Sequence, residues 1–145
     1  MGEFKARILY DSVNIKPGKP TVFGVCTGKP VFGLAGNPVS SSTIFEILVL
    51  PALRKMMGFS DFERRQVTAW LESAFQSRTR RDNYHPALTR LQDDRFLVMP
   101  LTSRGSADVL AFSKCNSFLV VPGEIGQYAA GDAVSVILMN DFWPA

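Results

Sequence analysis

Two lysines in a bend rich in proline and glycine are the residues best suited to chemistry in this sequence. Lys16 and Lys19 lie three positions apart in the segment Asn14-Ile15-Lys16-Pro17-Gly18-Lys19-Pro20. Proline restricts φ and glycine permits a turn, so the segment can hold two ammonium groups together at little entropic cost. Paired cations of this kind bind oxyanions such as phosphate. The other interpretation is a solvated turn with two surface lysines.

A helix start further along the chain offers a second group of anion-binding features. The apolar run Val31–Leu34 leads into Ala35-Gly36-Asn37-Pro38, and Ser40 to Ser42 follow. Asn37 is a favourable N-cap, and Pro38 suits the first helical position because it has no N–H to leave unpaired. Backbone N–H groups and the helix dipole make such a start favourable for anions. The sequence predicts a strand, a tight turn and a helix, with the lysines near the helix start.

The helix predicted after Asn37 ends at Gly58. Apolar residues recur at helical spacing from Phe45 to Met56, and glycine suits the C-cap geometry. Pro51 falls inside the helix and removes one backbone hydrogen bond, so we expect a kink near Ile47.

Three strands are expected before this helix, over residues 7–15, 21–26 and 29–34. Thr27-Gly28 is either a hairpin turn or the end of a strand that enters a sheet. The strand–helix unit indicates the edge of an α/β layer, but too little chain comes before it to complete a doubly wound sheet. We therefore expect the sequence to begin within a domain.

The second half of the chain has the pattern of a small β domain. Short runs rich in β-forming residues occur at 66–75, 84–91, 96–101, 118–121 and 133–139. Turn residues separate these runs, which favours a small antiparallel barrel or sandwich. One helix is expected over Ala107–Cys115, with Ser106 as its N-cap.

Composition and charge narrow the class of protein. The 145 residues suffice for one domain or two small ones, and the net charge is +3. This charge is compatible with a small anionic ligand but too weak to argue for nucleic acid, and Arg78, Arg80 and Arg81 are interpreted as a solvated loop.

Cys26 and Cys115 lack the spacing of a zinc site, and a disulfide between them is possible but not indicated. No secretory signal or membrane span is evident, so we expect a cytoplasmic protein.

Five short motifs follow one another in order along the chain. They are Lys16–Pro20 (K-P-G-K-P), Gly33–Ser40 (G-L-x-G-N-P-V-S), Pro51–Gly58 (P-A-L-R-K-M-M-G), Gly105-Ser106 and Ala130–Val134 (A-G-D-x-V). In this order they resemble the C-terminal part of the MoeA/gephyrin-E family, the molybdopterin molybdenumtransferases. The resemblance covers nearly the whole chain.

The resemblance implies an α+β fold in two parts. Residues 1–60 would be the C-terminal piece of an α/β molybdopterin-binding domain, and residues 64–145 the small antiparallel β-barrel domain. Family members have four domains. The rest of the α/β domain, with most of the ligands for Mg²⁺, and the regions that dominate dimerisation would lie outside this sequence. It would thus be a piece of a longer protein or a split gene product, without a metal site of its own.

The reaction implied by the resemblance joins molybdate to the dithiolene of adenylylated molybdopterin (molybdopterin-AMP), with magnesium-assisted release of AMP. Lys16 and Lys19 would be the catalytic cations. The binding residues would be Pro20, Gly36, Asn37, Pro38, Ser40 and Ser106. The pocket is shared between subunits in this family, so the resemblance implies a homodimer, and it implies neither nucleic acid nor membrane as a partner.

Two positions depart from the family pattern. Ala35 replaces the proline before Gly-Asn-Pro. Pro86 stands where an arginine is usual, and Arg81 or Arg90 could serve in its place. His85, the only histidine, could instead donate to an anion, although a histidine in a strand is more often structural.

Two other functions remain open from the sequence. The chain could be a non-catalytic binding or assembly module of the gephyrin-E type, or a divergent paralogue that keeps pterin binding without the chemistry. If the chain is part of the enzyme, the segment alone is expected to lack full catalysis because half of the site would be elsewhere.

Overall fold

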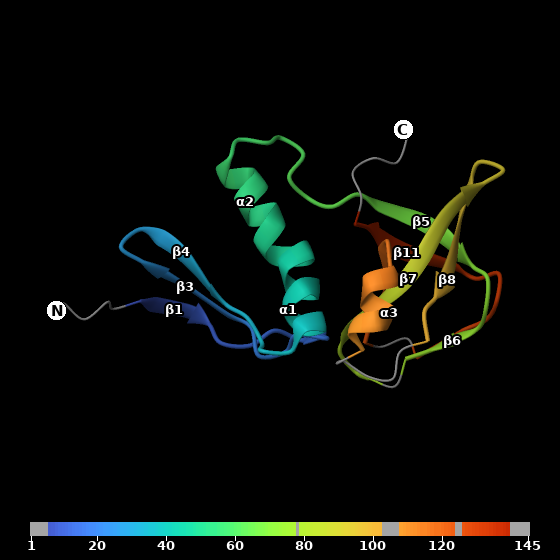
Figure 1. Ribbon diagram of the computed structural model, residues 1–145, viewed down its shortest axis with the longest axis horizontal. Helices are drawn as coiled ribbons and strands as arrows, with labels where there is room; N and C mark the ends of the chain where they lie inside the picture. Colours follow the sequence, from blue (N-terminus) through green and yellow to red (C-terminus); the bar gives the residue numbers. More distant parts are fainter. Residues whose placement is uncertain (1–5, 78, 103–107, 124–125, 140–145) are drawn as a thin grey trace.

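The computed structural model describes residues 6–77, 79–102, 108–123 and 126–139. Three parts follow one another across Figure 1: a small sheet, a helical segment and a barrel. The α+β fold class is thereby confirmed, including the small β-barrel. The division of the chain into domains at residues 60–64 stays a prediction, and a loop occupies that position between the last long helix and the barrel.

Four short strands form the first part of the chain. They are β1 (Arg7–Tyr10), β2 (Ile15–Lys16), β3 (Val22–Cys26) and β4 (Lys29–Gly33). The strands β1, β3 and β4 form an antiparallel sheet in the order β1-β3-β4. Thr27 and Gly28 have positive φ angles of 49° and 77°. These angles match a tight hairpin turn, so the hairpin is the correct alternative of the two expected from the sequence.

A continuous helical segment follows the hairpin. It consists of α1 (Pro38–Ile44), the π-helical stretch η1 (Phe45–Val49) and α2 (Leu50–Met56). The predicted kink position, Ile47, lies within this π-helical stretch: the N–H of Leu50 donates to the carbonyl of Phe45, five residues back. Pro51 has no N–H to donate, and the wider turn before it accommodates this loss.

The helical segment ends as the sequence predicts. Gly58 has a φ of 87°, which glycine adopts without strain. Its N–H donates to the carbonyl of Lys55 at 3.1 Å, and the N–H of Phe59 donates to the carbonyl of Arg54 at 3.1 Å. These two bonds are those of a Schellman motif, which pairs the last carbonyls of the helix.

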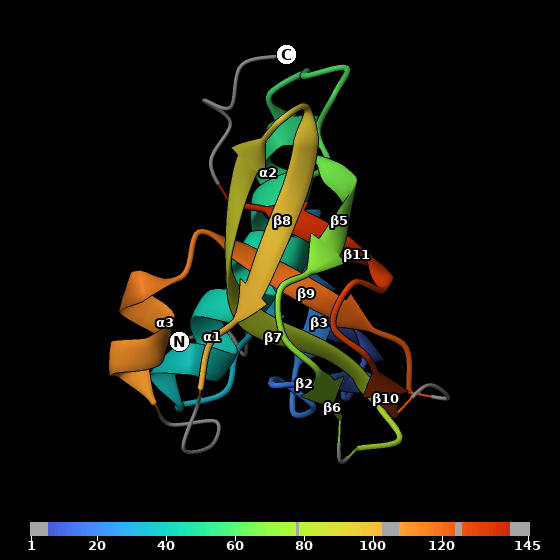
Figure 2. The ribbon, with the colours of Figure 1, turned by 90° about the vertical axis from the view of Figure 1, so that its right-hand side faces the viewer.

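The remaining elements build the barrel domain. They are β5 (Gln66–Leu71), β6 (Phe75–Gln76), β7 (Asp82–Gln92), β8 (Arg95–Pro100), α3 (Val109–Lys114), β9 (Ser117–Val121), β10 (Gln127–Tyr128) and β11 (Ala133–Leu138). Five of the strands close on themselves in the order β7-β8-β5-β11-β9, and β9 pairs back to β7. Figure 2 shows this arrangement with α3 at one side, next to α1.

One strand pair corrects the expectation of a purely antiparallel barrel. The strands β5 and β8 are parallel, with Ala69 opposite Phe96 and Leu71 opposite Val98. The chain passes through β6 and β7 between these two strands, so it returns to run beside β5 in the same direction. A parallel pair needs such a crossover, whereas the antiparallel pairs can be joined by short turns.

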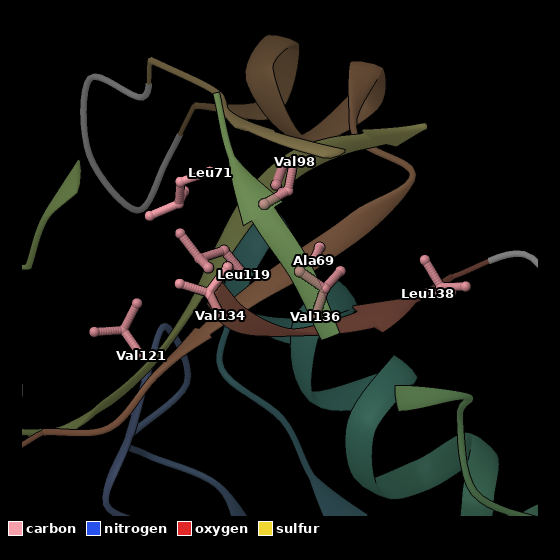
Figure 3. Packing of buried hydrophobic residues seen from close by; sticks show 9 residues of the cluster. Ala69, Leu71, Val98, Leu119, Val121, Val134, Val136 and Leu138 are labelled. Carbon is pink, nitrogen blue, oxygen red and sulfur yellow. The ribbon is translucent and has the colours of Figure 1, made fainter. Parts of the chain in front are cut away.

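Alternate residues of the strands fill the barrel. Val134, Val136 and Leu138 of β11 are buried, and so are Ala69 and Leu71 of β5. Side chains from β8 and β9 join them in one apolar cluster (Figure 3). This cluster is the main core of the described structure. It holds together the barrel strands, including β7, which pairs with the strand β2 that carries Lys16.

The packing of this core predicts the effect of a cavity. Leu119 on β9 has no exposed surface, so Leu119→Ala should lower the free energy of unfolding by about 2–5 kcal/mol. Leu110→Ala is the control, since Leu110 on α3 is 75% exposed and its truncation should change stability by about 0.5 kcal/mol or less. Urea denaturation followed by circular dichroism measures both; equal losses would contradict this assignment of the core.

Candidate anion-binding site

Backbone hydrogen bonds hold the lysine bend in one shape. The carbonyl of Lys19 accepts from the N–H groups of Val13 at 3.0 Å and Thr21 at 2.9 Å. The hydroxyl of Thr21, which has no exposed surface, donates to the carbonyl of Gly18 at 2.7 Å. These bonds fix the backbone from which both lysine side chains extend.

The bend packs directly against α1. Gly18 is buried and has a φ of +116°. A Cβ atom built on Gly18 would lie 2.5 Å from Cγ1 of Ile44, and 3.7 Å from the carbonyl oxygen of Ser40. The bend can therefore lie this close to the first helical turns only because residue 18 has no side chain. The structure thus brings together the two segments that the sequence singled out.

The same bend is tied to the barrel on its other side. The strand β2 runs parallel to the start of β7, with Lys16 opposite Asn83. The guanidinium of Arg81 donates through Nη1 to the carbonyl of Ile15 at 3.2 Å. The N–H of Asp82 donates to the carbonyl of Asn14 at 3.2 Å. The lysine bend is therefore a junction between α1 and the barrel.

The two lysines differ in exposure. Lys19 is exposed, whereas Lys16 is half-buried. Burial lowers the pKa of the His85 imidazole, and the nearby positive charge of Lys16 lowers it further, against the opposing effect of its hydrogen bond to Leu101. Lys16 belongs to β2, the strand that pairs with β7 of the barrel. The convergence of the two ammonium groups on the helix start stays a prediction.

The Asn37 cap forms as predicted, but it changes which backbone N–H groups are left to bind an anion. The side-chain oxygen of Asn37 accepts from the N–H groups of Val39 at 3.0 Å and Ser40 at 3.3 Å. These two N–H groups are consequently paired within the protein, and Pro38 has none to offer. What the helix start can give an anion is the positive end of its dipole and the N–H groups that come before the cap.

The other predicted binding residues lie in different surroundings. Pro20, Gly36 and Pro38 are exposed, while Ser40 is only 6% exposed and its carbonyl oxygen lies 3.7 Å from the Cβ position of Gly18. Ser106 lies outside the described residues. The helix expected after it is present as α3, which begins at Val109.

The residues near Pro86 do not all reach the bend. The Nε2 atom of His85 donates to the carbonyl of Leu101 at 2.8 Å, since a carbonyl can only accept, so this nitrogen is not open to an anion. Arg90 pairs with Glu72 at 2.5 Å. Of the two arginines considered as replacements for the expected one, Arg81 is the one beside the lysine bend.

The sequence did not point to an open groove of about 390 Å³ beside α1 and α3. Its described lining residues are Leu34, Ser41, Ser42, Phe45, Glu46 and Phe112. The carboxylate of Glu46 pairs with Arg64 at 2.5 Å. Apolar walls and a carboxylate suit this groove to an uncharged or amphipathic group rather than to a dianion. Its residues come from three separate elements, so no sequence spacing could have revealed it.

Two further properties of the site concern metals and cysteine. Among the described residues, no group of three or more His, Cys, Asp or Glu side chains could hold a metal ion. Cys26 and Cys115 are free thiols. Burial raises the pKa of Cys115 to about 11, so its thiol is protonated at neutral pH and is a poor nucleophile.

Within the part of the chain that the structure describes, every helix is too short or too polar to cross a bilayer.

Known proteins share both the sequence and the arrangement of this chain. Residues 68–139 match the family model described as the MoeA C-terminal region (domain IV). A molybdopterin molybdenumtransferase of Staphylococcus epidermidis is 32% identical over 134 residues, and one of Staphylococcus aureus is 31% identical over 134 residues. Each alignment covers 92% of this chain and 32% of the relative. The chain thus spans about a third of the length of these curated relatives.

Solved structures show the same fold. The molybdopterin biosynthesis MoeA protein of Pyrococcus horikoshii superposes with a TM-score of 0.75 at 32% identity, over 93% of this chain and 32% of that one. A molybdenum cofactor biosynthesis protein of Pyrococcus furiosus gives 0.73 at 29% identity, over 92% and 46% of the two chains.

The helical segment and the closed barrel of this chain therefore have the same arrangement as about a third of the MoeA protein of Pyrococcus horikoshii. Through this part, the chain belongs to the MoeA family.

The docking of the bend predicts a steric effect at Gly18. Gly18→Ala introduces both an unfavourable φ and a clash with Ile44. Gly28→Ala is a matched control, because Gly28 has a φ of +77° but nothing within 4 Å of its Cβ position. The free energy of unfolding in urea should fall by about 1–3 kcal/mol more for Gly18→Ala than for the control. Equal effects would show that the bend does not pack on Ile44.

The surroundings of His85 predict a pH dependence of stability. Because its pKa is lowered in the folded protein, the unfolded chain binds a proton before the folded one as the pH falls below about 6.5. The contribution of neutral His85 to the free energy of unfolding should therefore be fully present above that pH and decline below it. Urea midpoints at about pH 7.5 and 5.5 should differ more for the unmodified chain than for His85→Gln. The same difference in both proteins would rule out His85 as the cause.

Proposed function

We propose that this chain supplies the C-terminal part of a site that inserts molybdate into adenylylated molybdopterin. The observation that carries the proposal is the docking of the lysine bend on α1, with the Cβ position of Gly18 2.5 Å from the Ile44 side chain. This contact brings the backbone of the lysine bend against α1, and the proposal is that both lysine side chains reach the positive end of that helix. Membership of the MoeA family supports the same reaction.

Each residue of the proposed site has a defined contribution. Lys16 and Lys19 attract the molybdate dianion, and the start of α1 adds its dipole. The exposed Gly36 and Pro38 leave the approach to the helix start open. Pro20, Asn37 and Ser40 shape and fix the two segments, and Ser106 would add a hydroxyl from the barrel domain. Molybdate and molybdopterin-AMP are the substrates, and AMP is released when the metal joins the dithiolene.

Arg81 is a candidate for the cation that Pro86 cannot supply. Its Nη1 donates to the carbonyl of Ile15, the residue before Lys16. A guanidinium has further N–H groups that one such bond leaves for an anion. Arg81 could thus act with Lys16 on the barrel side of the bend.

Magnesium does not fit the described part of this chain, which has no cluster of carboxylates to hold it. We therefore propose that magnesium ligands come from the part of the relatives that this chain does not cover, and that the segment alone has incomplete activity. Association as a homodimer and a cytoplasmic location belong to the same proposal.

A binding or assembly module of the gephyrin-E type is the second candidate function. The groove beside α1 and α3 favours it, because its walls include the apolar side chains of Leu34, Phe45 and Phe112. A pocket of this kind suits an amphipathic segment of another protein. A paralogue that retains pterin binding without chemistry would share the fold and differ in the lysine-dependent step.

Oxyanion binding separates these candidates. Molybdate binding to the 145-residue chain, measured by calorimetry at low salt, should weaken by about tenfold in Lys16→Ala and in Lys19→Ala, because each removes a charged donor. Lys29→Ala is the control, since Lys29 is exposed at the hairpin turn away from α1. No measurable molybdate affinity, or an equal loss in the control, would contradict the proposed site and favour the binding module.

A further inference from the structure

The groove beside α1 and α3 takes apolar side chains from both of its sides. Leu34 precedes α1 and Phe45 begins η1, with exposed fractions of 36% and 39%, and Phe112 comes from α3. Figure 2 shows α1 and α3 next to each other. The groove of about 390 Å³ is near the lower end of the range for pockets that hold one small ligand, about 300–1,000 Å³. It therefore suits one large side chain better than an extended surface.

Oxygen atoms complete the lining of the groove. The hydroxyl of Ser41 donates to the carbonyls of Asn37 at 3.2 Å and Pro38 at 3.1 Å, and its oxygen can still accept. The carboxylate of Glu46 accepts from Nε of Arg64 at 2.9 Å, and a carboxylate has about four acceptor sites. Apolar walls with acceptor oxygens fit an uncharged ring that carries one N–H donor. The indole ring of tryptophan is such a group.

The end of the described chain lies beside the α3 side of this groove. The N–H of Met139 donates to the carbonyl of Asn116 at 2.9 Å. The Sδ atom of Met139 lies 3.6 Å from Sγ of Cys115, and that Sγ lies 2.9 Å from the carbonyl oxygen of Phe112. The chain that follows Met139 therefore starts next to the turn of α3 that lines the groove.

A second set of contacts connects the end of β11 with the helical side of the groove. The N–H of Leu138 donates to the carbonyl of Arg65 at 2.9 Å, and the neighbouring Arg64 pairs with Glu46. Burial is the main cause of the raised pKa of Cys115, and the negative charge of Glu46 contributes to it. The Glu46 carboxylate, the Cys115 thiol and the end of β11 therefore lie close together.

The sequence after Met139 contains a side chain that matches the groove. It reads Asn140-Asp141-Phe142-Trp143-Pro144-Ala145 and lies outside the described residues. Of its two aromatic residues, only Trp143 has an N–H donor. Because Trp143 follows Met139 by four positions, its Cα can lie anywhere within about 13–14 Å of that of Met139. This reach includes the groove beside Phe112.

Charge and connectivity favour this segment over a separate partner. Two exposed basic residues flank the end of β11: Arg65, whose carbonyl bonds to Leu138, and Lys114, which precedes Cys115. Asp141 brings the opposite charge, which adds an attraction that salt weakens. A short covalent connection also gives the segment an effective concentration in about the millimolar range at the groove. A separate protein would have to compete with it.

We propose that the segment Asn140–Ala145 folds back on the barrel domain and inserts Trp143 between Phe45 and Phe112 in the groove. A segment of another protein, as in the second candidate function, would then have to displace it. The proposal goes beyond the proposed function and does not depend on whether the lysine bend binds molybdate.

The fluorescence of Trp143 tests this docking in the 145-residue chain. The chain has two tryptophans, so Trp70→Phe leaves Trp143 as the only one. Acrylamide should quench its emission about threefold less efficiently than that of the free peptide Asn140–Ala145, because a ring packed against apolar side chains is shielded from solvent. Its emission maximum should lie at a shorter wavelength than that of the peptide. Quenching as efficient as in the peptide would overturn the proposal.

Variants of the lining residues show whether the shielding comes from the groove. In the same background, Phe45→Ala and Leu34→Ala should each raise the quenching towards the value of the peptide, because each removes apolar contact with the ring. Leu53→Ala is the matched control, since Leu53 is 40% exposed in the same helical segment and lies outside the described lining of the groove. Circular dichroism verifies the fold of each variant.

Two further outcomes would overturn the proposal. Shielding that persists in both Phe45→Ala and Leu34→Ala would mean that Trp143 packs elsewhere. Shielding that is lost on dilution of the chain would mean that a second copy supplies the segment.

Discussion

The contact between Gly18 and Ile44 is the constraint on which the arrangement of the site depends. Residue 18 lies where a Cβ would overlap the Ile44 side chain, and its φ of +116° is one that glycine alone adopts readily. The absence of a side chain lets the lysine bend rest on α1. Because β2, which contains Lys16, pairs with β7, the same few residues also join α1 to the barrel. A shift of the bend would therefore move the proposed site and the junction together.

The helix start supports an anion differently from what its sequence suggests. Asn37 is both the best cap and the reason that two N–H groups are already used, since its side chain accepts from Val39 and Ser40. The remaining attraction is long-range: the helix dipole and the lysine charges, without a competing carboxylate from the bend. Such attraction orients a dianion less strictly than direct hydrogen bonds do. This is consistent with a site that needs additional groups, such as those of Ser106 or of another polypeptide, to hold its substrate for reaction.

Local features of the structure could be predicted from the sequence, because local chemistry determines them. The Asn37 cap, the turn at Thr27-Gly28 and the helix end at Gly58 all follow from side-chain hydrogen bonding or from φ preferences. The strands of the barrel followed from their spacing. The irregularity expected near Ile47 lies in the π-helical stretch, and its form depends on how the helix accommodates the missing N–H of Pro51.

Pairings between distant segments could not be predicted in the same way. The parallel pair of β5 and β8 depends on the path of the chain through β6 and β7. Likewise, the bond from Arg81 to Ile15 joins residues 66 positions apart, and no periodicity encodes it. The family resemblance indicated which residues to consider, whereas the structure showed that His85 is engaged by Leu101 and that Arg81, rather than Arg90, lies at the bend.

In the proposed function, the bend and the helix start form one site for a tetrahedral dianion. A titration of the ¹⁵N-labelled chain with molybdate, followed by amide chemical shifts, tests this directly. If they form one site, the amides of Gly18 and Lys19 in the bend, and of Gly36 and Asn37 at the helix start, should shift along saturable curves with a single shared Kd. Different Kd values for the two segments, or shifts that drift without saturation at scattered surface lysines, would contradict it.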